Sequence, residues 1–368
     1  MDVTVERDPL FRALSRLQGV VDKRHTMAIL TNAVLTAEAG HLSIVGTDLE
    51  VSLEQRVPAT VRAGGTAAVS ARALFEIVRE SAEDEVQLNS DDHALVVVYG
   101  SSRFRLMGVD PGEHPGMPEP GGEALAEIEI DAGDLAEMIR KTLFSVSTDD
   151  TRTNLTGVYL DRGSEDGQIR FVATDGHRLA MIDRPASGAA PAGGAILPRK
   201  GLAELGKLLA DAVGNVRIVT SSSEAVATVG DARLSMRLVE GSFPDYQKVI
   251  PEKGGVRIEA ERDALLGSLR RVSIVSSERI RGVRLRLREG TLEVSASNPD
   301  LGEASEEITV ESEGGEIEVG FNARYLLDVL AVFPESSKVT VELGDELGPG
   351  LVRGEDPGYR YVVMPMRI

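Results

Sequence analysis

Three stretches of the chain alternate apolar and polar residues and then end in a small polar turn. They read LSIVGTDL at residues 42–49, IRFVATDG at 169–176 and LEVSASNP at 292–299. Alternation with a period of two is typical of a β-strand that buries one face. The three turns follow one another at an interval of about 125 residues. The pattern therefore predicts one strand and turn that is built three times along the chain.

Apolar residues spaced three and four apart predict two kinds of helix, and each kind also occurs three times. One helix opens each copy of the pattern, at residues 10–21, 134–146 and 263–275. The other lies in residues 68–78, 196–209 and 319–330, each of which runs from a short strand into a helix. Because these landmarks keep the same order and nearly the same interval, we expect a unit of about 123 residues that is repeated three times.

The segments between these landmarks have the pattern of β-hairpins. Residues 94–109 and 225–239 alternate with a period of two around short turns that contain glycine. Each unit is therefore expected to hold two helices and roughly eight strands, which is an α+β fold dominated by antiparallel sheet. Linkers are expected in the segments 110–123 and 251–255, which contain proline and glycine. We expect three domains, at residues 1–122, 123–252 and 253–368.

Composition places the chain among soluble globular proteins. Of its 368 residues, 42% are hydrophobic and 27% are charged, and none is cysteine. The lack of cysteine excludes disulfides, thiol catalysis and cysteine-ligated zinc. No run of 18 apolar residues predicts a membrane span, and the charged N-terminus does not resemble a signal peptide. We therefore expect a cytoplasmic protein with no membrane partner.

The formal net charge of −19 at first argues against a nucleic-acid partner. Contact is decided, however, by the local sign of a surface. Basic residues fall opposite the apolar stripe on several predicted helices, and this group comprises Arg12, Arg16, Arg72, Arg79, Lys200 and Lys207. Together they predict a basic surface that contacts phosphates without reading sequence. Aromatic residues make up only 4% of the chain, so stacking of bases on an aromatic platform is not expected.

The stretch FVATDGHRLAMID at residues 171–183 places Asp175, His177 and Arg178 close enough to suggest catalysis. The sequence motifs of a nucleophilic serine, a phosphate-binding loop and a dinucleotide-binding loop do not occur. The five histidines lack the spacing of metal ligands, so neither a metal nor a cofactor is expected. Asp175 also corresponds to Asp48 in the repeat, which favours a turn-forming role. A hydrolase that uses Asp175 and His177 is the alternative hypothesis, and a peptide-binding scaffold with no DNA role is a third.

Six longer motifs carry a resemblance to a known family. They read ATDGHRLA at residues 173–180, LPRKG at 197–201, FPDYQKVIP at 243–251, RGVRL at 281–285, ASNPD at 296–300 and YVVMPMRI at 361–368. In this order, and together with the threefold repeat, they resemble the bacterial replicative sliding clamp, the beta subunit of DNA polymerase III. The resemblance covers essentially the whole chain.

The resemblance implies a processivity factor that catalyses no reaction. Two copies of the chain would pair head to tail as a ring-shaped homodimer, with helices around a central hole and sheets outside. The ring would encircle duplex DNA without sequence specificity, in the cytoplasm at the nucleoid. An apolar groove would bind short linear motifs of the polymerase III alpha subunit, the clamp loader, other polymerases, ligase and mismatch-repair proteins.

The resemblance also implies which residues carry each role. The partner-peptide groove would consist of Leu155, Thr174, Gly176, His177, Arg178, Leu179, Pro244, Lys248, Val249, Val362, Val363, Met364, Pro365, Met366, Arg367 and Ile368. The residues facing DNA would be Arg24, Arg72, Arg152, Arg199, Lys200 and Arg281. The dimer interface would place Phe104 and Leu106 against Ile274 and Val275 of the other chain. The chain departs from some relatives at Asp149, where an amide can occur, at Thr153 and Asn154, where aromatics occur, and at Lys248, where arginine occurs.

Overall fold

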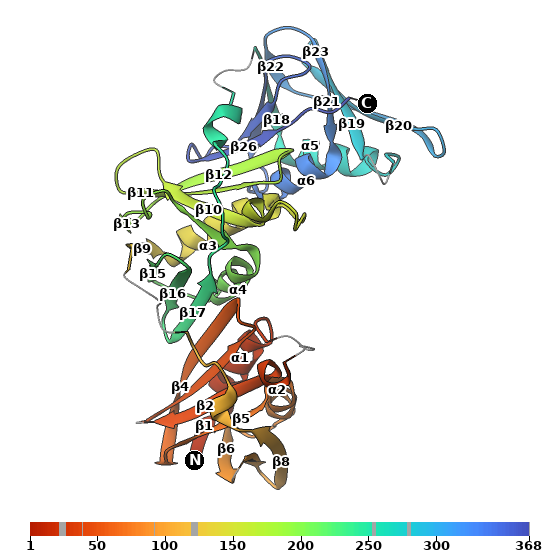
Figure 1. Cartoon of the computed structure of the whole chain (residues 1–368). Helices are drawn as coiled ribbons and strands as arrows, with labels where there is room; N and C mark the ends of the chain where they lie inside the picture. Colours follow the sequence, from red (N-terminus) through yellow and green to blue (C-terminus); the bar gives the residue numbers. More distant parts are fainter. Residues whose placement is uncertain are drawn as a thin grey trace. The chain divides into compact units, whose positions relative to one another are not determined.

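The computed structural model describes residues 1–21, 27–38, 40–91, 93–118, 124–251, 255–277 and 281–367. Two of the predicted site residues, Arg24 and Ile368, lie outside the described residues. Within the described ranges, α-helices occur together with antiparallel strands, which confirms the expected α+β class (Figure 1). The described ranges contain no helix that is long and apolar enough to cross a membrane.

The described part of the chain has six α-helices, two in each third, as the apolar spacing predicts. They are α1 (Arg7–Leu17), α2 (Ala71–Arg79), α3 (Ala132–Thr142), α4 (Arg199–Leu209), α5 (Arg262–Val272) and α6 (Ala323–Val332). Short 3-10 helices are η1 (Ala28–Thr31), η2 (Pro111–Glu113), η3 (Leu143–Ser145), η4 (Thr153–Leu155) and η5 (Tyr246–Val249). Helix α1 ends before the predicted residue 21, although Val20 and Val21 are buried. The apolar spacing there reports burial beyond the end of the helix.

Strands make up most of the remaining described residues, with eight or nine described strands in each third. The first third has β1 (Asp2–Glu6), β2 (Asn32–Glu38), β3 (His41–Thr47), β4 (Val51–Ala63), β5 (Gly65–Ser70), β6 (Glu85–Asp91), β7 (Ala94–Tyr99) and β8 (Ser102–Val109). The second has β9 (Ala126–Asp131), β10 (Gly157–Arg162), β11 (Gln168–Thr174), β12 (Arg178–Pro185), β13 (Ser187–Gly188), β14 (Ala195–Pro198), β15 (Asn215–Thr220), β16 (Glu224–Val229) and β17 (Ala232–Arg237). The last has β18 (Val256–Glu261), β19 (Gly282–Arg288), β20 (Thr291–Asn298), β21 (Gly302–Thr309), β22 (Glu311–Glu313), β23 (Ile317–Asn322), β24 (Lys338–Leu343), β25 (Gly350–Arg353) and β26 (Tyr359–Val363).

Packing divides the chain into two compact units. The first unit comprises residues 1–136 and 186–239, and the second comprises residues 137–185 and 240–368. In the first unit the strand order is β1-β6-β7-β8-β5-β2-β3-β4-β17-β16-β15-β9-β13, so β4 pairs with β17 of the next third. In the second unit the order β10-β11-β12-β26-β25-β24-β18-β22 pairs β12 with β26. Neighbouring thirds thus share a sheet, and the three-domain division at residues 122 and 252 stays a prediction.

The core lies between the helices and the sheets. In the first unit, Leu10, Leu14 and Leu17 of α1 are fully buried, and this helix packs on β3 and β4. The ring of Phe11 stacks on Phe75 of α2 with 5.5 Å between their centres. In the second unit, α5 packs on β20 and β21, while α6 packs on β23 and β26. The apolar stripes of the sequence therefore become the contact faces of the helices.

The second helix in each third begins at an equivalent residue of the repeat. Ser70, Pro198 and Asn322 are the N-cap residues of α2, α4 and α6. The Ser70 hydroxyl accepts a hydrogen bond from the Ala73 amide at 3.3 Å, and the Asn322 side chain accepts one from the Arg324 amide at 3.0 Å. Such caps satisfy backbone amides that the first helical turn leaves unpaired. The repeat seen in sequence is therefore also a repeat of local structure.

The polar turns that follow the alternating strands are also equivalent. One carboxylate oxygen of Asp48 accepts hydrogen bonds from two backbone amides, one of Asp175 does the same, and the Asn298 side chain accepts one. These are Asx turns, and they confirm that Asp175 forms a turn. The next position is Leu49 in the first third, with φ 76°, and Gly176 in the second, with φ 88°. Glycine adopts this backbone at little cost, so the second turn is the less strained of the two.

Candidate partner-binding groove

An apolar cavity of about 260 Å³ opens in the second compact unit, and we refer to it as the groove. Four segments of the chain line it, through Leu155, Thr174, Gly176, Arg178, Leu179, Pro244, Asp245, Tyr246, Val249, Val362 and Met364. Nine of these residues are among those that the resemblance implies for a partner groove. Asp245 and Tyr246 are not, although the motif FPDYQKVIP contains both. The structure therefore brings most of the predicted set together and adds two residues to it.

Strand register builds the floor of the groove. Strand β11 pairs with β12 so that Thr174 lies opposite Leu179, and β12 pairs with β26 so that Leu179 lies opposite Val362. Leu179 and Val362 are almost completely buried beneath the opening. An apolar floor with a few polar groups at its edge suits the apolar anchor side chains of a short peptide.

The equivalent strand pairing in the first compact unit has different chemistry. Strand β4 pairs with β17 so that Ser52 lies opposite Ser235. Both serines are buried, and the Ser52 hydroxyl hydrogen-bonds the hydroxyl of Thr47 at 2.7 Å. Two serines replace the leucine and valine of the groove floor. The apolar floor thus belongs to the β12–β26 pairing and not to every copy of the repeat.

Arg178 is buried at the start of β12 and is held from several sides. Its guanidinium pairs with Asp175 at 3.1 Å and with Asp328 at 2.6 Å, and it donates to the carbonyl of Phe144 at 2.6 Å. It also lies 4.5 Å from the ring centre of Tyr325. Asp328 and Tyr325 belong to α6, so these contacts fix the groove strand against that helix. Asp175 and Arg178 of the suspected catalytic stretch therefore form ion pairs that stabilise the fold.

His177 lies between the lining residues Gly176 and Arg178 without lining the groove itself, and it contacts the end of the chain. The carbonyl of His177 accepts a hydrogen bond from the amide of Met364 at 2.8 Å, and its imidazole stacks on Tyr325 with 6.4 Å between ring centres. The amide of Met366 donates to the carbonyl of Gly320 at 2.8 Å. The described end of the chain is therefore docked. A second cavity of about 440 Å³ is lined in part by Pro365, Met366 and Arg367.

Two more predicted groove residues lie near the groove without lining it. Lys248 is 80% exposed and pairs with Asp245 at 2.8 Å, which raises the pKa of the lysine through a side-chain hydrogen bond. Val363 is buried in β26 next to the lining residue Val362. Lys248 therefore offers a positive charge at the rim, whereas Val363 contributes to the core below it.

Five of the residues predicted to face DNA are described, and acidic partners are seen for Arg72, Arg152 and Lys200. These ion pairs join Arg72 to Glu76 at 2.8 Å, Arg152 to Asp149 at 3.1 Å, and Lys200 to Asp48. Arg199 and Arg281 are exposed. The carboxylate at Asp149, one of the departures from some relatives, thus offsets the charge of Arg152. Contact between these residues and DNA stays a prediction.

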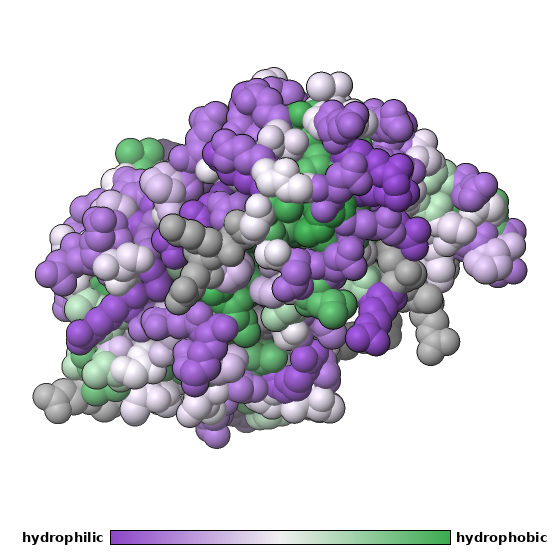
Figure 2. Space-filling view, turned by 90° about the horizontal axis from the view of Figure 1, so that it is seen from above, coloured by the Kyte–Doolittle hydropathy of each residue, from purple (hydrophilic) through white to green (hydrophobic). Residues whose placement is uncertain are grey.

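The residues predicted for the dimer interface lie on exposed parts of both compact units. Phe104 and Leu106 are on β8, and the Phe104 side chain is 36% exposed. Ile274 and Val275 follow α5, and Ile274 is 76% exposed. Figure 2 shows one face of the molecule, on which apolar surface is set among polar side chains. A single exposed isoleucine is common on protein surfaces, so the pairing of these residues between two chains stays a prediction.

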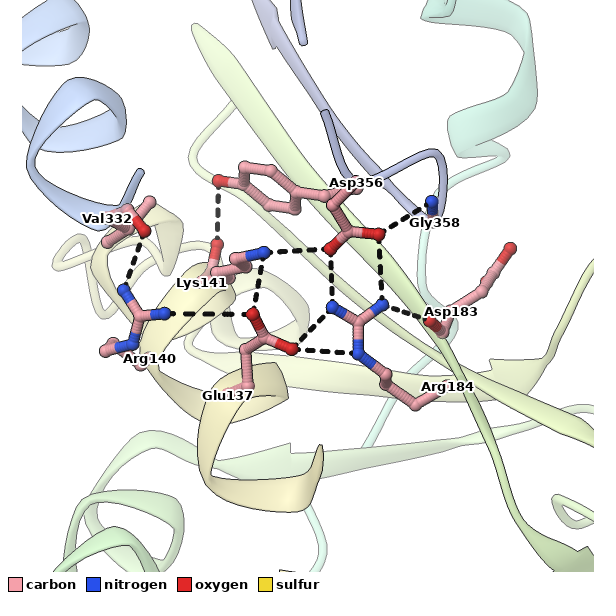
Figure 3. A network of polar contacts seen from close by, with 9 residues as sticks. Glu137, Arg140, Lys141, Asp183, Arg184, Val332, Asp356 and Gly358 are labelled. Carbon is pink, nitrogen blue, oxygen red and sulfur yellow. Dashed lines mark hydrogen bonds and ion pairs between the residues drawn. The ribbon is translucent and has the colours of Figure 1, made fainter. Parts of the chain in front are cut away.

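An ion network around a buried lysine ties both groove strands to helix α3 (Figure 3). The ammonium of Lys141 lies 2.8 Å from a carboxylate oxygen of Glu137 and 2.8 Å from one of Asp356, and its side chain is 4% exposed. Arg184 on β12 pairs with the same two carboxylates. Burial by itself would raise the pKa of Asp356, but hydrogen bonds from Arg184 and Lys141 lower it to about 2. Because Asp356 comes just before β26, the network fixes the ends of both strands.

Metal chemistry has no evident site in the described ranges, which contain no group of three or more histidine, aspartate and glutamate side chains that could hold an ion. The candidate site consists instead of a small apolar cavity whose lining residue Arg178 is held by ion pairs. Such an arrangement can bind a peptide and hold its own shape.

Comparison with known proteins assigns the chain to a family. The models of the N-terminal, central and C-terminal domains of the DNA polymerase III beta subunit match residues 1–118, 129–245 and 247–367. The beta sliding clamp of Pseudomonas aeruginosa is 38% identical, and the match covers all of both chains. Among solved structures, a Pseudomonas aeruginosa sliding clamp bound to griselimycin is 37% identical with a TM-score of 0.95, and Caulobacter crescentus pol III beta is 36% identical with a TM-score of 0.92, each over all of both chains. The chain belongs to the DNA polymerase III beta subunit family, the bacterial beta sliding clamps.

Proposed function

We propose that the chain works as a sliding clamp that encircles duplex DNA without sequence specificity and tethers the replicative polymerase to it. The observation that carries the proposal is the groove, which assembles nine of the residues that the resemblance implies into one apolar cavity. Family membership makes the chain an accessory subunit with no reaction of its own. The hydrolase hypothesis for Asp175 and His177 is therefore wrong, and the Asx turn at Asp175 gives the physical reason.

The groove is proposed to bind short linear motifs in other proteins. Leu179 and Val362 supply an apolar floor, Met364 a flexible apolar wall, and Lys248 a positive charge at the rim. The proposed partners are the polymerase III alpha subunit, the clamp loader, other polymerases, ligase and mismatch-repair proteins. A partner held this way sees a high effective concentration of its DNA substrate, because the ring keeps it on the same molecule.

Retention on DNA is the test of the sliding function. The protein is loaded with its clamp loader onto nicked circular DNA, and the circle is then cut once. We expect the protein to remain on the circle at a salt concentration that removes electrostatic binding, and to leave through the ends of the linear form. Equal retention on both forms would mean that the protein grips DNA instead of encircling it.

A head-to-tail homodimer is proposed through β8 of one chain and β21 of the other. Strand β21 is an edge strand of the order β21-β20-β19-β23, and its exposed residues include Glu303 and Glu307. Strand β8 pairs with β5 only near Val109, and its free stretch includes exposed Arg103 and Arg105. Two open strand edges of opposite charge are suited to pair between chains.

The dimer is expected to show in the mass of the protein in solution. Light scattering should give about twice the chain mass of 39.3 kDa. Ile274→Asp should shift the mass to that of one chain at the same concentration, because it places a charge on the most exposed apolar residue near α5. The control Val213→Asp changes a fully exposed valine in the first compact unit and should leave the dimer mass unchanged. A single-chain mass for the unaltered protein would contradict the ring.

A further inference from the structure

Three rows of side chains cross one face of the sheet below the groove. Alternate residues of a strand point to the same face, so each row is read across paired strands. The row at the groove contains Thr174, Leu179 and Val362. The second row contains Tyr159, Val172 and Met181, and the third contains Asp161, Arg170 and Asp183. The face thus changes from apolar to charged over about 13 Å, four residues along a strand. We refer to the third row as the charged row.

The charged row is an acid–arginine–acid arrangement in which the arginine is buried. Arg170 pairs with Asp183 through two bonds, Nε to Oδ1 at 2.6 Å and Nη2 to Oδ2 at 2.7 Å. The hydroxyl of Ser164 donates to the same carboxylate at 2.7 Å. These bonds set the plane of the guanidinium. Its remaining nitrogen, Nη1, points to Tyr246.

Tyr246 spans from the groove to the charged row. Its ring belongs to a buried cluster with Leu179 and Val362, which form the groove floor. Its hydroxyl donates to Oδ2 of Asp161 at 2.8 Å and accepts from Nη1 of Arg170 at 3.2 Å. The side chain is only 6% exposed, so loss of either bond would leave a polar group without a partner away from water. The hydroxyl is therefore fixed in place.

The side of the groove formed by Pro244 and Val249 depends on Tyr246, and we refer to this side as the wall. Tyr246 is the first residue of η5, and the lining residues Pro244 and Val249 lie on either side of it in sequence. The residue before η5, Asp245, makes no capping hydrogen bond with its side chain. Phe243 adds a stacking contact on Tyr159, with 4.8 Å between ring centres. A single 3-10 turn has little stability of its own, so these side-chain contacts decide where the wall stands.

We propose that Tyr246 is a positioning residue for partner binding: the charged row, acting through the Tyr246 hydroxyl, fixes the wall formed by Pro244 and Val249 and so keeps the groove open at its bound width. The inference rests on the proposed function of the groove. A wall that is already in place binds more tightly, because the peptide does not have to order it.

The substitution Tyr246→Phe tests this, because it removes one oxygen atom and keeps the ring. The probe is a fluorescent pentapeptide carrying two leucines and a phenylalanine. We expect about fivefold weaker binding to the Tyr246→Phe dimer, with the change in the dissociation rate. Hydrogen exchange should also become faster at the amides of residues 247–250, which a general loss of stability would not single out.

Three further variants separate positioning from stability. Tyr99→Phe removes a hydroxyl that donates to the carbonyl of Ile77 at 3.3 Å in the first compact unit, so it should leave peptide affinity unchanged. Asp161→Asn keeps an oxygen that can accept from the phenol and should bind peptide nearly as the unaltered protein does. Asp161→Ala removes that oxygen and should match Tyr246→Phe.

The outcomes distinguish this inference from the groove function on which it rests. Unaltered affinity in Tyr246→Phe, with normal peptide binding by the parent protein, overturns the positioning role alone. If the parent protein does not bind the peptide, the groove function and the positioning role both fail. Equal losses in Tyr246→Phe and Tyr99→Phe would assign the effect to overall stability and would also overturn the proposal.

Discussion

Replacing Met364 with aspartate is expected to weaken peptide binding by about 100-fold, which corresponds to about 3 kcal/mol. Met364 lines the groove and is partly exposed, so a carboxylate there would have to be desolvated against an apolar anchor of the peptide. Its backbone amide would still donate to the carbonyl of His177, so the terminal strand should stay docked. Fluorescence anisotropy with the same pentapeptide measures the change.

The control for this prediction is Leu125→Asp. Leu125 is 59% exposed in the first compact unit, so the same change of character is made on a surface away from the groove. The control should bind peptide like the parent protein. Tight binding by Met364→Asp would place the peptide site elsewhere on the molecule.

Lys141→Met is expected to destabilise the second compact unit by about 3 kcal/mol, because it removes a buried cation and leaves two carboxylates with one positive charge fewer. The lysine touches two carboxylates, those of Glu137 and Asp356, and the methionine would offer them no hydrogen bond. Arg184 would remain as a counter-charge and limit the loss. Urea unfolding, followed by hydrogen exchange in β12 and β26, measures the effect.

Arg72→Met provides a control on another helix. Arg72 also pairs with an acid on its own helix, Glu76 at 2.8 Å, but the two side chains are 63% and 47% exposed. Exposed ion pairs contribute about 0–1 kcal/mol, so this variant should unfold almost like the parent protein. Equal costs for Lys141→Met and Arg72→Met would show that burial of the lysine does not matter.

The repeated framework could be predicted from sequence because its signals are local. Alternation over eight residues identifies a strand, apolar residues three and four apart identify a helix, and the Thr-Asp positions identify turns, all without knowledge of the rest of the fold. The end of α1 could not be predicted in this way, because Val20 and Val21 continue the apolar spacing after the helix has ended. Periodicity reports which side chains are buried. It gives the length of a helix only where the buried pattern and the helix end at the same residue.

The groove was predictable only in part, for a related reason. Residues such as Leu179 and Val362 stand in motifs that carry the family resemblance, so they could be named one by one. Tyr246 also stands in a family motif, but its role could not be predicted, because that role depends on Asp161 and Arg170, which are far from it in sequence and adjacent to each other only through strand register. The network of Lys141 and Asp356 is hidden for the same reason. Pairing across strands is a property of the fold, and one sequence does not display it.

The residues predicted to face DNA were easy to name, but their contacts within the protein were not. A basic residue on the polar side of a helix is easy to identify, but its acidic partner is not. Lys200 has the right position on α4, yet it pairs with Asp48 of the previous third. Its charge therefore also holds two copies of the repeat together, and a charge-reversal variant there would disturb both roles.

The sheets that run from one third of the sequence into the next have a consequence for how such a ring could come apart. The β4–β17 and β12–β26 ladders each join five residue pairs, and each lies inside a compact unit. Separating one third of the chain from the next would break a continuous ladder and expose the buried residues beneath it. The seams between chains, by contrast, would be held by one strand edge and a few exposed side chains. A loader that must admit DNA would therefore meet the least resistance at a seam, and the thirds of each chain would travel together.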